Sequence, residues 1–247
     1  MHKLIFLFGM MIAIGGGDSP YPFSLGERIS YLVDYQAGFS WPDAGKVTFS
    51  IDSGTYQGKA CFRFSGIGSS MAWYDWFYPV RDQYYSWADL KTLQPYCFQR
   101  IVNEGSHHYK QTAWFHFDEG YANIETEEKG TKTKTKVKIS ANATDPLAGI
   151  YHCRNIDWKS KKPGFSFVLP LLLEDSVYAS TVRFEGKVNL TVNGKTVPCF
   201  KIRPALIEGS LFKGGTEMSV YLRETDLIPI RVEAPIVVGK VVARLKR

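Results

Sequence analysis

The chain has 247 residues, and its 30 basic and 24 acidic side chains give a formal net charge of +6 at pH 7. So small a positive excess gives no support to nucleic-acid binding. Aromatic residues make up 15% of the chain, as is typical of a β-rich protein with a large core or an aromatic-lined groove. The length suits one large domain.

The first 17 residues have the pattern of a secretory signal peptide. Lys3 supplies a positive charge, and Leu4–Ile14 is an apolar run that is too short to span a bilayer, which takes roughly 20 residues. Gly17 is a small residue suited to cleavage. We therefore expect a periplasmic protein whose mature part, residues 18–247, is a single β-rich domain without a transmembrane span. An uncleaved anchor is the alternative.

The residues after this leader alternate between apolar and polar side chains, as strands do. The first three such segments are Ile29–Gln36, Gly45–Asp52 and Lys59–Phe64, with interruptions at Ala37-Gly38, Trp41-Pro42-Asp43 and Ser53-Gly54. Links this short cannot carry parallel crossovers, so an antiparallel meander is expected.

The stretch Ser70–Gly105 holds more aromatic residues and paired charges than any other segment. Its first part is too dense in aromatic residues for strand alternation and predicts a short helix or an irregular wall that ends at Pro79. Strands are expected at Val80–Asp89 and Tyr96–Asn103. The aromatic residues of the first part are Trp73, Tyr74, Trp76, Phe77 and Tyr78.

Alternation resumes at Ser106–Asp118 and Ala122–Glu128 and then gives way to a tract in which lysine alternates with threonine. The lysines share one strand face. They either block edge pairing, as charges on edge strands commonly do, or form a basic stripe that contacts an anionic surface. The lysines are Lys132, Lys134, Lys136 and Lys138.

Asp145–Asp157 has the spacing of a helix, with Thr144 or Asp145 as its cap and Pro146 in its first turn. Phe165–Leu173 is strongly apolar but is interrupted by Pro170. Later strands are expected near Val177–Phe184, Lys187–Val192, Val197–Ile202, Thr216–Arg223, Ile228–Val232 and Ile236–Leu245. We therefore predict a mainly β fold: a large curved antiparallel sheet, a half-barrel or open barrel, with one or two short helices packed on it.

The chain has four cysteines, and export permits disulfides between them in three complete pairings. A domain of this length does not need cross-links, so buried thiols are the alternative. No two cysteines have C-x-x-C spacing, which gives no support to a zinc or redox site. The cysteines are Cys61, Cys97, Cys153 and Cys199.

No nucleophile elbow, phosphate-binding loop, zinc-protease motif or dinucleotide fingerprint is present. His108 and His116 would lie roughly 26 Å apart on a continuous strand and cannot share a metal. We therefore expect no catalytic residues, no metal and no cofactor. The central block also holds a set of charges for which structural ion pairing is expected: Arg81, Asp82, Asp89, Arg100 and Glu104.

Several blocks, taken in order, resemble an exported bacterial family, the domain of unknown function 3108, as found in Bacteroides-type bacteria. The resemblance implies a curved antiparallel sheet with a few helices, similar to periplasmic lipoprotein carriers and other half-barrels, and it implies no reaction. The blocks are Pro22–Arg28 with Tyr31 and Tyr35, Trp41–Gly45, Tyr74–Asp82, Glu104-Gly105, Ile150–Asn155, Pro204–Gly209 and Ile228–Ile230 with Gly239.

A strongly twisted sheet of this size tends to curl, and a helix that only partly fills the concave side leaves an apolar cleft. We therefore expect a non-catalytic binding or carrier protein for a lipid or another apolar or amphiphilic envelope molecule. The alternatives are a solid-core structural or interaction module with an envelope protein partner, a glycan-binding module with Trp41, Trp87 or Trp114 in a planar row, and a hydrolase. The expected ligand-binding residues are Trp73, Trp76, Phe77, Tyr78, Tyr151, Arg154, Phe165 and Phe167.

Overall fold

The computed structural model describes residues 20–205, 217–236 and 238–246. The predicted signal peptide, residues 1–17, lies outside this part of the chain. The described residues form fourteen strands, one α-helix, α1 (Pro146–Arg154), and one 3-10 turn, η1 (Trp158–Ser160). The strands are β1 (Arg28–Ala37), β2 (Phe39–Tyr56), β3 (Lys59–Ser70), β4 (Arg81–Asp89), β5 (Pro95–Glu104), β6 (His107–His116), β7 (Tyr121–Glu128), β8 (Thr131–Lys138), β9 (Ser166–Leu173), β10 (Ser176–Val192), β11 (Lys195–Pro204), β12 (Ser219–Arg223), β13 (Pro229–Pro235) and β14 (Lys240–Leu245).

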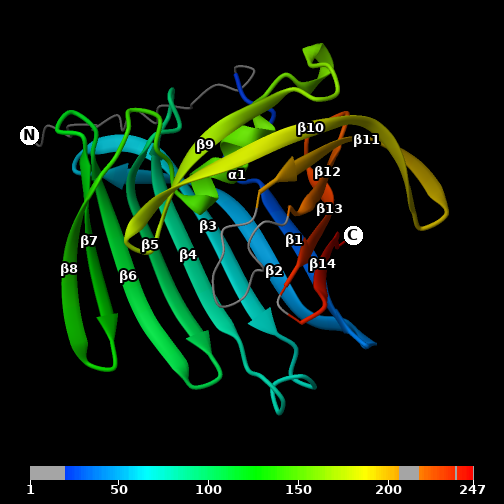
Figure 1. Cartoon of the computed structure of the whole chain (residues 1–247), viewed down its shortest axis with the longest axis horizontal. Helices are drawn as coiled ribbons and strands as arrows, with labels where there is room; N and C mark the ends of the chain where they lie inside the picture. Colours follow the sequence, from blue (N-terminus) through cyan, green and yellow to red (C-terminus); the bar gives the residue numbers. More distant parts are fainter. Residues whose placement is uncertain (1–19, 206–216, 237, 247) are drawn as a thin grey trace, which may run out of the picture.

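All fourteen described strands belong to one antiparallel sheet with the order β8-β7-β6-β5-β4-β3-β2-β1-β14-β13-β12-β11-β10-β9. Two meanders, β1–β8 and β9–β14, are joined where β1 pairs with β14, for example at Tyr31 opposite Leu245. The sheet curls but does not close, so β8 and β9 are its edges (Figure 1). The predicted curved antiparallel sheet with a short helix is confirmed.

The helix α1 lies inside the curl, against β3 and β4 on one side and β9 on the other (Figure 1). Two glycines allow this close packing. A Cβ on Gly66 would lie 3.3 Å from Leu147 Cδ2, and a Cβ on Gly149 would lie 3.2 Å from Leu169 Cδ2. The helix therefore fills part of the concave side.

Of the two predicted capping residues, Thr144 and Asp145, it is Asp145 that caps α1. Its Oδ1 accepts hydrogen bonds from the backbone N–H groups of Leu147 (2.8 Å) and Ala148 (3.0 Å). The helix ends at Arg154, three residues before the predicted end at Asp157.

The predicted interruption at Ala37-Gly38 is confirmed as the turn between β1 and β2, but those at residues 41–43 and 53–54 are wrong, because β2 runs through both of them. At the first, the register with β1 shifts between Val33 and Tyr35, so that residues 42–44 of β2 bulge opposite Asp34 alone, and Asp43 takes a positive φ of 52°. At the second, Gly54 stays in the ladder opposite Cys61. Pairing with one neighbouring strand, β1 at the first and β3 at the second, carries β2 through these local turn signals.

The predicted interruption at Pro170 is also absent, because β9 is continuous. Pro170 O accepts a hydrogen bond from Thr144 N (2.9 Å), and Leu172 N donates to Thr144 O (2.8 Å). The polar backbone groups of Pro170 and Leu172 therefore face away from β10. An edge strand tolerates proline where the missing N–H would point outward.

The four cysteines are free, and three of them, Cys61, Cys97 and Cys199, are buried. Burial raises the pKa of the Cys97 and Cys153 thiols to about 12. These thiols are protonated at neutral pH and behave as small apolar side chains. The sequence left disulfides and buried thiols as alternatives, and the structure contains free thiols.

Candidate functional site

A cavity of about 940 Å³ lies within the curl of the sheet. This volume is near the upper end of the range for small-molecule sites, which is about 300–1,000 Å³. Aliphatic side chains from both meanders form much of its wall, so the interior of this protein is not filled by its own core. These residues are Ile29, Val47, Val102, Ile124, Leu169, Leu171, Leu173, Val182, Ile202, Met218, Val220, Leu222 and Val232.

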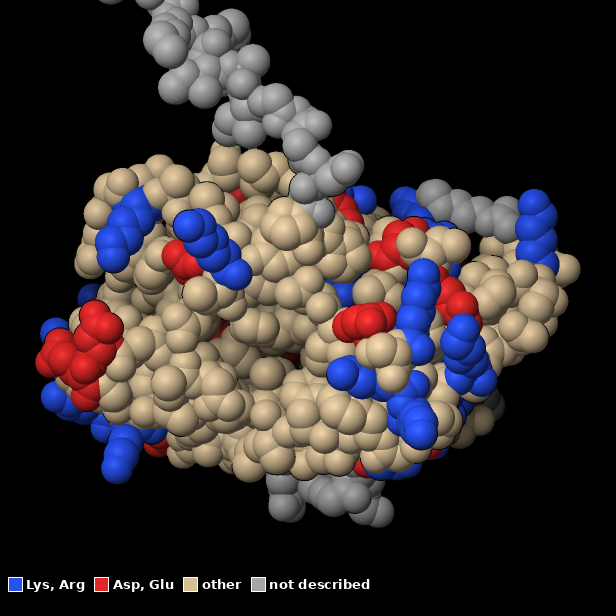
Figure 2. Space-filling model, turned by 90° about the horizontal axis from the view of Figure 1, so that it is seen from above, with Lys and Arg blue, Asp and Glu red and all other residues tan. Residues whose placement is uncertain are grey.

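Apart from Ile150 of α1, the exposed lining residues come from the two ends of the unclosed sheet. His107 and Thr133 belong to the β6–β8 end, and Glu174 and Asp175 belong to the turn between β9 and β10. The cavity therefore reaches solvent between the two free edges. Seen from above, the molecule has a hollow near the middle of its surface, and the charged side chains gather toward the two sides of that face (Figure 2).

Arg100 is a charged residue in this wall, and it is only 6% exposed. Its Nε donates a hydrogen bond to Gln111 Oε1 (3.1 Å), and its guanidinium carbon lies 4.8 Å from the centre of the Tyr109 ring. The closest carboxylate is that of Glu174, 3.9 Å from Nη2, and Glu174 is itself 64% exposed. Within the described residues, neither Nη1 nor Nη2 has a hydrogen-bond partner.

Glu104 is a second ionisable residue in the wall. Burial, followed by the hydrogen bond that protonated Glu104 donates to Asp82, raises the pKa of Glu104 to about 7. Asp82 is buried as well and accepts a hydrogen bond from Asn103 N (2.9 Å). Glu104 therefore carries a proton for part of the time at neutral pH, which reduces the negative charge beside the cavity.

The other charges of the central block pair locally. Arg81 forms an ion pair with Asp75 at 2.6 Å within the β3–β4 connection. Asp89 accepts hydrogen bonds from Tyr96 Oη (2.7 Å) and from its own turn, and despite partial burial these bonds lower its pKa to about 2. Arg100 differs from these residues because its closest carboxylate, that of the exposed Glu174, approaches only to 3.9 Å.

Two predicted ligand-binding residues, Tyr151 and Arg154, line the cavity. The Tyr151 ring stacks on Phe64 with 4.0 Å between centroids. The Arg154 guanidinium is held by Glu27 through contacts of 2.5 and 3.0 Å, and its Nε donates to the carbonyl of Leu227 (3.2 Å). The donors of Arg154 are therefore used within the protein.

Phe165 and Phe167 lie outside the cavity lining. Each ring packs on Trp158 with 6.4 Å between centroids. They belong to the second of two buried clusters, and this cluster also contains Val182, which does line the cavity. Their contact with a ligand stays a prediction.

The four remaining aromatic residues lie in the β3–β4 connection and are exposed: Trp73 by 45%, Trp76 by 78%, Phe77 by 57% and Tyr78 by 42%. The sequence predicted either a short helix or an irregular wall for this segment. The connection consists of turns, so the structure has the irregular form. These residues do not line the cavity, but the connection reaches it indirectly. Gly105 N, next to Glu104, donates a 2.8 Å hydrogen bond to the carbonyl of residue 79.

The lysine tract forms the edge strand β8. Lys132 pairs with Glu127 and Lys134 with Glu125, both at 3.4 Å across the ladder. Lys136 Nζ lies 3.5 Å from the centre of the Tyr121 ring. These partners favour the edge-blocking interpretation. Contact of Lys132, Lys134, Lys136 and Lys138 with an anionic surface stays a prediction.

The three tryptophans considered for glycan binding do not form one row. Trp87 and Trp114 are half-buried and flank Cys97, which is opposite each of them in the ladder. Trp41 instead stacks on Trp73, with 6.3 Å between the ring centroids. The planar aromatic surface that a glycan module needs is therefore absent from this set of residues.

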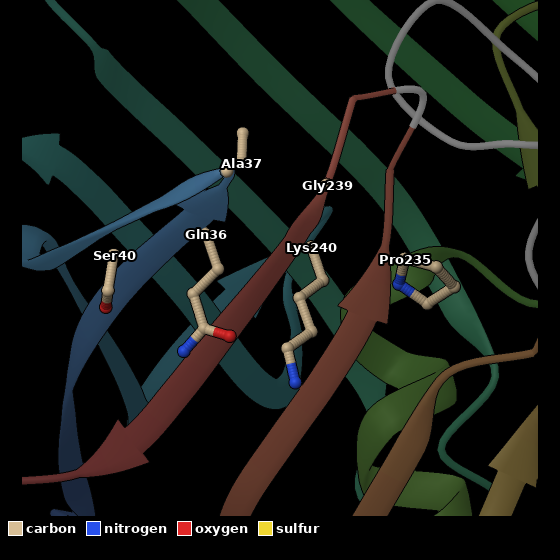
Figure 3. A pocket seen from close by; sticks show the side chains of 7 residues that line it. Gln36, Ala37, Ser40, Pro235, Gly239 and Lys240 are labelled. Atoms are coloured by element: carbon tan, nitrogen blue, oxygen red, sulfur yellow. The ribbon is translucent and has the colours of Figure 1, made fainter.

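A second, shallow pocket lies where β1, β2, β13 and β14 end (Figure 3). Gln36 and Lys240 point the same way from neighbouring strands, and Lys240 is the charged residue of the lining. The lining also includes Ser40 but no acidic or histidine side chain that could serve it as a base. Across the described residues, no group of three or more His, Cys, Asp or Glu side chains could hold a metal ion. None of the described helices has the length and apolar composition that crossing a membrane takes.

The family model described as Protein of unknown function (DUF3108) matches residues 30–246. Among solved structures, the chain resembles a β-barrel-like protein of domain of unknown function DUF1849 from Brucella abortus, with a TM-score of 0.55, 12% identity and coverage of 89% of this chain and 95% of that chain. At this identity the likeness shows the fold alone. A DUF1329 family protein from Desulfovibrio piger ATCC 29098 has a TM-score of 0.29, 9% identity and coverage of 89% and 83%. No curated protein matches the chain.

Proposed function

Since this chain belongs to the DUF3108 family, whose function is unknown, we propose its function from its own cavity: it binds or carries an apolar or amphiphilic molecule of the cell envelope. The observation that carries this proposal is the 940 Å³ space that the core leaves unfilled, with aliphatic side chains in its wall. Leaving so much apolar surface without a packing partner is unfavourable, and a bound apolar ligand would remove that cost. The predicted leader supports a periplasmic location.

The position of the opening supports the same proposal. Most of the exposed residues of the lining lie toward the two ends of the strand order, so a ligand can enter there without unpairing a strand of the ladder. A fully closed barrel would offer entry only at its ends. The unclosed sheet therefore suits a protein that loads and releases its ligand.

The exposed aromatic residues have a secondary place in this proposal. Trp76 and Phe77 lie on the connection that is hydrogen-bonded to the residue after Glu104, and Glu104 lines the cavity. We assign them to the first contact with an incoming apolar ligand, while Tyr151 contacts the bound ligand. Trp73 and Tyr78 flank the same connection, and Phe165 and Phe167 support the cavity wall from behind.

Filling the cavity tests the proposal. Leu171 lines the cavity, whereas Val168 on the same strand is 51% exposed and does not. Leu171→Trp places a large side chain in the ligand's space, and Val168→Trp adds the same side chain outside the lining. With hexadecan-1-ol as the probe, we expect binding to the wild type and to Val168→Trp, and a loss of at least ten-fold in affinity for Leu171→Trp. Equal binding by both variants would overturn the proposal.

A further inference from the structure

We propose that the ligand is an amphiphile with a carboxylate head, and that Arg100 binds that head. This inference rests on the proposed function and deepens it. Arg100 is a buried charged residue in a cavity wall that is rich in aliphatic side chains. Arg100 is directed inward from β5, on the same face as the buried Phe98 and Val102.

A buried guanidinium is costly unless a carboxylate or several acceptors satisfy it. Arg154 shows how this protein satisfies a structural arginine, because Glu27 binds both of its terminal nitrogens, at 2.5 and 3.0 Å. Arg100 has no such partner, since Glu174 approaches only to 3.9 Å and is 64% exposed. The terminal nitrogens of Arg100 are therefore available to a ligand.

The orientation of Arg100 is fixed by groups that leave those nitrogens free. Gln111 takes the Nε–H of Arg100 and in turn donates to Thr126 Oγ1 (2.8 Å). The Tyr109 ring supports the guanidinium from one face. A guanidinium held in this way presents two parallel N–H groups, which match the two oxygens of a carboxylate.

The surroundings favour a singly charged head over a phosphate. Glu174 lies 3.9 Å from Arg100 Nη2, and Glu104 lies on the same face of β5, four residues further along the strand. A dianion would be repelled by these carboxyl groups more strongly than a carboxylate. The head would replace Glu174 as the partner of Arg100.

The test compares three probes of equal chain length, hexadecanoate, hexadecan-1-ol and hexadecyl phosphate, on the mature full-length protein at pH 7.5. We expect the wild type to bind hexadecanoate at least ten-fold more tightly than the alcohol. Arg100→Gln should remove that preference, so that the variant binds the acid no more tightly than the alcohol. Arg100→Lys keeps the positive charge but loses the two parallel N–H groups, so it should retain part of the preference for hexadecanoate. Arg63→Gln is the matched control, because Arg63 pairs with Asp52 and its side chain is 43% exposed.

A second variant keeps the test valid if Arg100→Gln does not fold. Glu174→Gln removes the competing carboxylate at an exposed position, so it should tighten hexadecanoate binding several-fold without changing alcohol binding. Equal affinity of the wild type for acid and alcohol, or tighter binding of hexadecyl phosphate, would overturn the carboxylate inference and leave the proposed function standing. Failure to bind any of the three probes would overturn both.

Discussion

Ser86 on β4 donates a 2.6 Å hydrogen bond from its Oγ to Oδ2 of Asp145, the residue that caps α1. Asp145 is fully buried, and its other oxygen accepts two backbone N–H groups of the helix. One carboxylate thus joins the start of the helix to the middle of the sheet. The position of α1, and with it the depth of the cavity, depends on this contact.

Replacing Ser86 with Ala should therefore destabilise the protein. The change leaves one oxygen of a buried carboxylate without its donor, which costs about 1–3 kcal/mol. Urea unfolding at neutral pH would measure the loss. Ser30 offers a control, because its hydroxyl lies in the outward-facing pair with Thr48, and Ser30→Ala should cost less than about 0.5 kcal/mol. Equal effects of the two changes would contradict the assigned role.

Asp145 should also give the protein a distinct pH dependence. Burial raises its pKa from 3.8 to about 6, so the folded state holds a proton that the unfolded state has already released. This contribution to stability is fully present below pH 4 and is lost as the pH rises through 6, by an amount on the order of 3 kcal/mol. Asn caps helices nearly as well and does not titrate.

The measurement is the free energy of unfolding of wild type and Asp145→Asn at several pH values. Relative to the variant, the wild type should lose stability between pH 4 and pH 6 and then change little. Parallel profiles across this interval would show that the carboxyl group does not titrate as described.

The glycine beneath α1 should tolerate no larger residue. A Cβ at Gly66 would lie 3.2 Å from Phe49 and 3.3 Å from Leu147, whereas at Gly68 on the same strand face the closest atom would be 4.0 Å away. Gly66→Val should cost about 1–3 kcal/mol through overpacking, and Gly68→Val should cost clearly less. Thermal unfolding of the two variants would compare them, and an equal loss would contradict the close packing of the helix on β3.

The stability of the protein should respond differently when one charged group is removed at each of the two buried arginines, Arg154 and Arg100. Glu27→Gln leaves the Arg154 guanidinium, 2% exposed, without its carboxylate, and breaking such a pair costs about 3–5 kcal/mol. Arg100→Gln removes a charge that has no close carboxylate, so stability should change by less than about 1 kcal/mol or increase. Denaturant unfolding separates the two cases. A large loss for Arg100→Gln would identify Arg100 as a structural residue.

Much of the fold follows from local sequence patterns. Alternation predicted most of the strands, and Asp145 followed by Pro146 predicted the start of α1. The failures lie where pairing with distant strands overrides a local signal. Pro170 marks a break only until the edge position of β9 is known, and the pairing of β1 with β14 joins segments about 200 residues apart, which local patterns cannot reveal.

The site was less predictable. Sequence reasoning selected Arg154, whose donors are used within the protein, and placed Arg100 among charges expected to form structural ion pairs. One signal was present: the alternation of Tyr96–Asn103 puts Arg100 on the same face as Phe98 and Val102, and a charge on a buried face is informative. The exposure of the aromatic residues in the β3–β4 connection could not be foreseen, because it depends on how the whole sheet curls.

The most direct test of the central claim, that the cavity holds an envelope amphiphile, is native mass spectrometry of the mature protein after export to a bacterial periplasm. The wild-type protein should carry a bound mass that organic extraction removes, that persists in Val168→Trp and that is absent from a folded Leu171→Trp variant. A clean unliganded mass for the wild type, with no uptake of added hexadecanoate or hexadecan-1-ol, would contradict it.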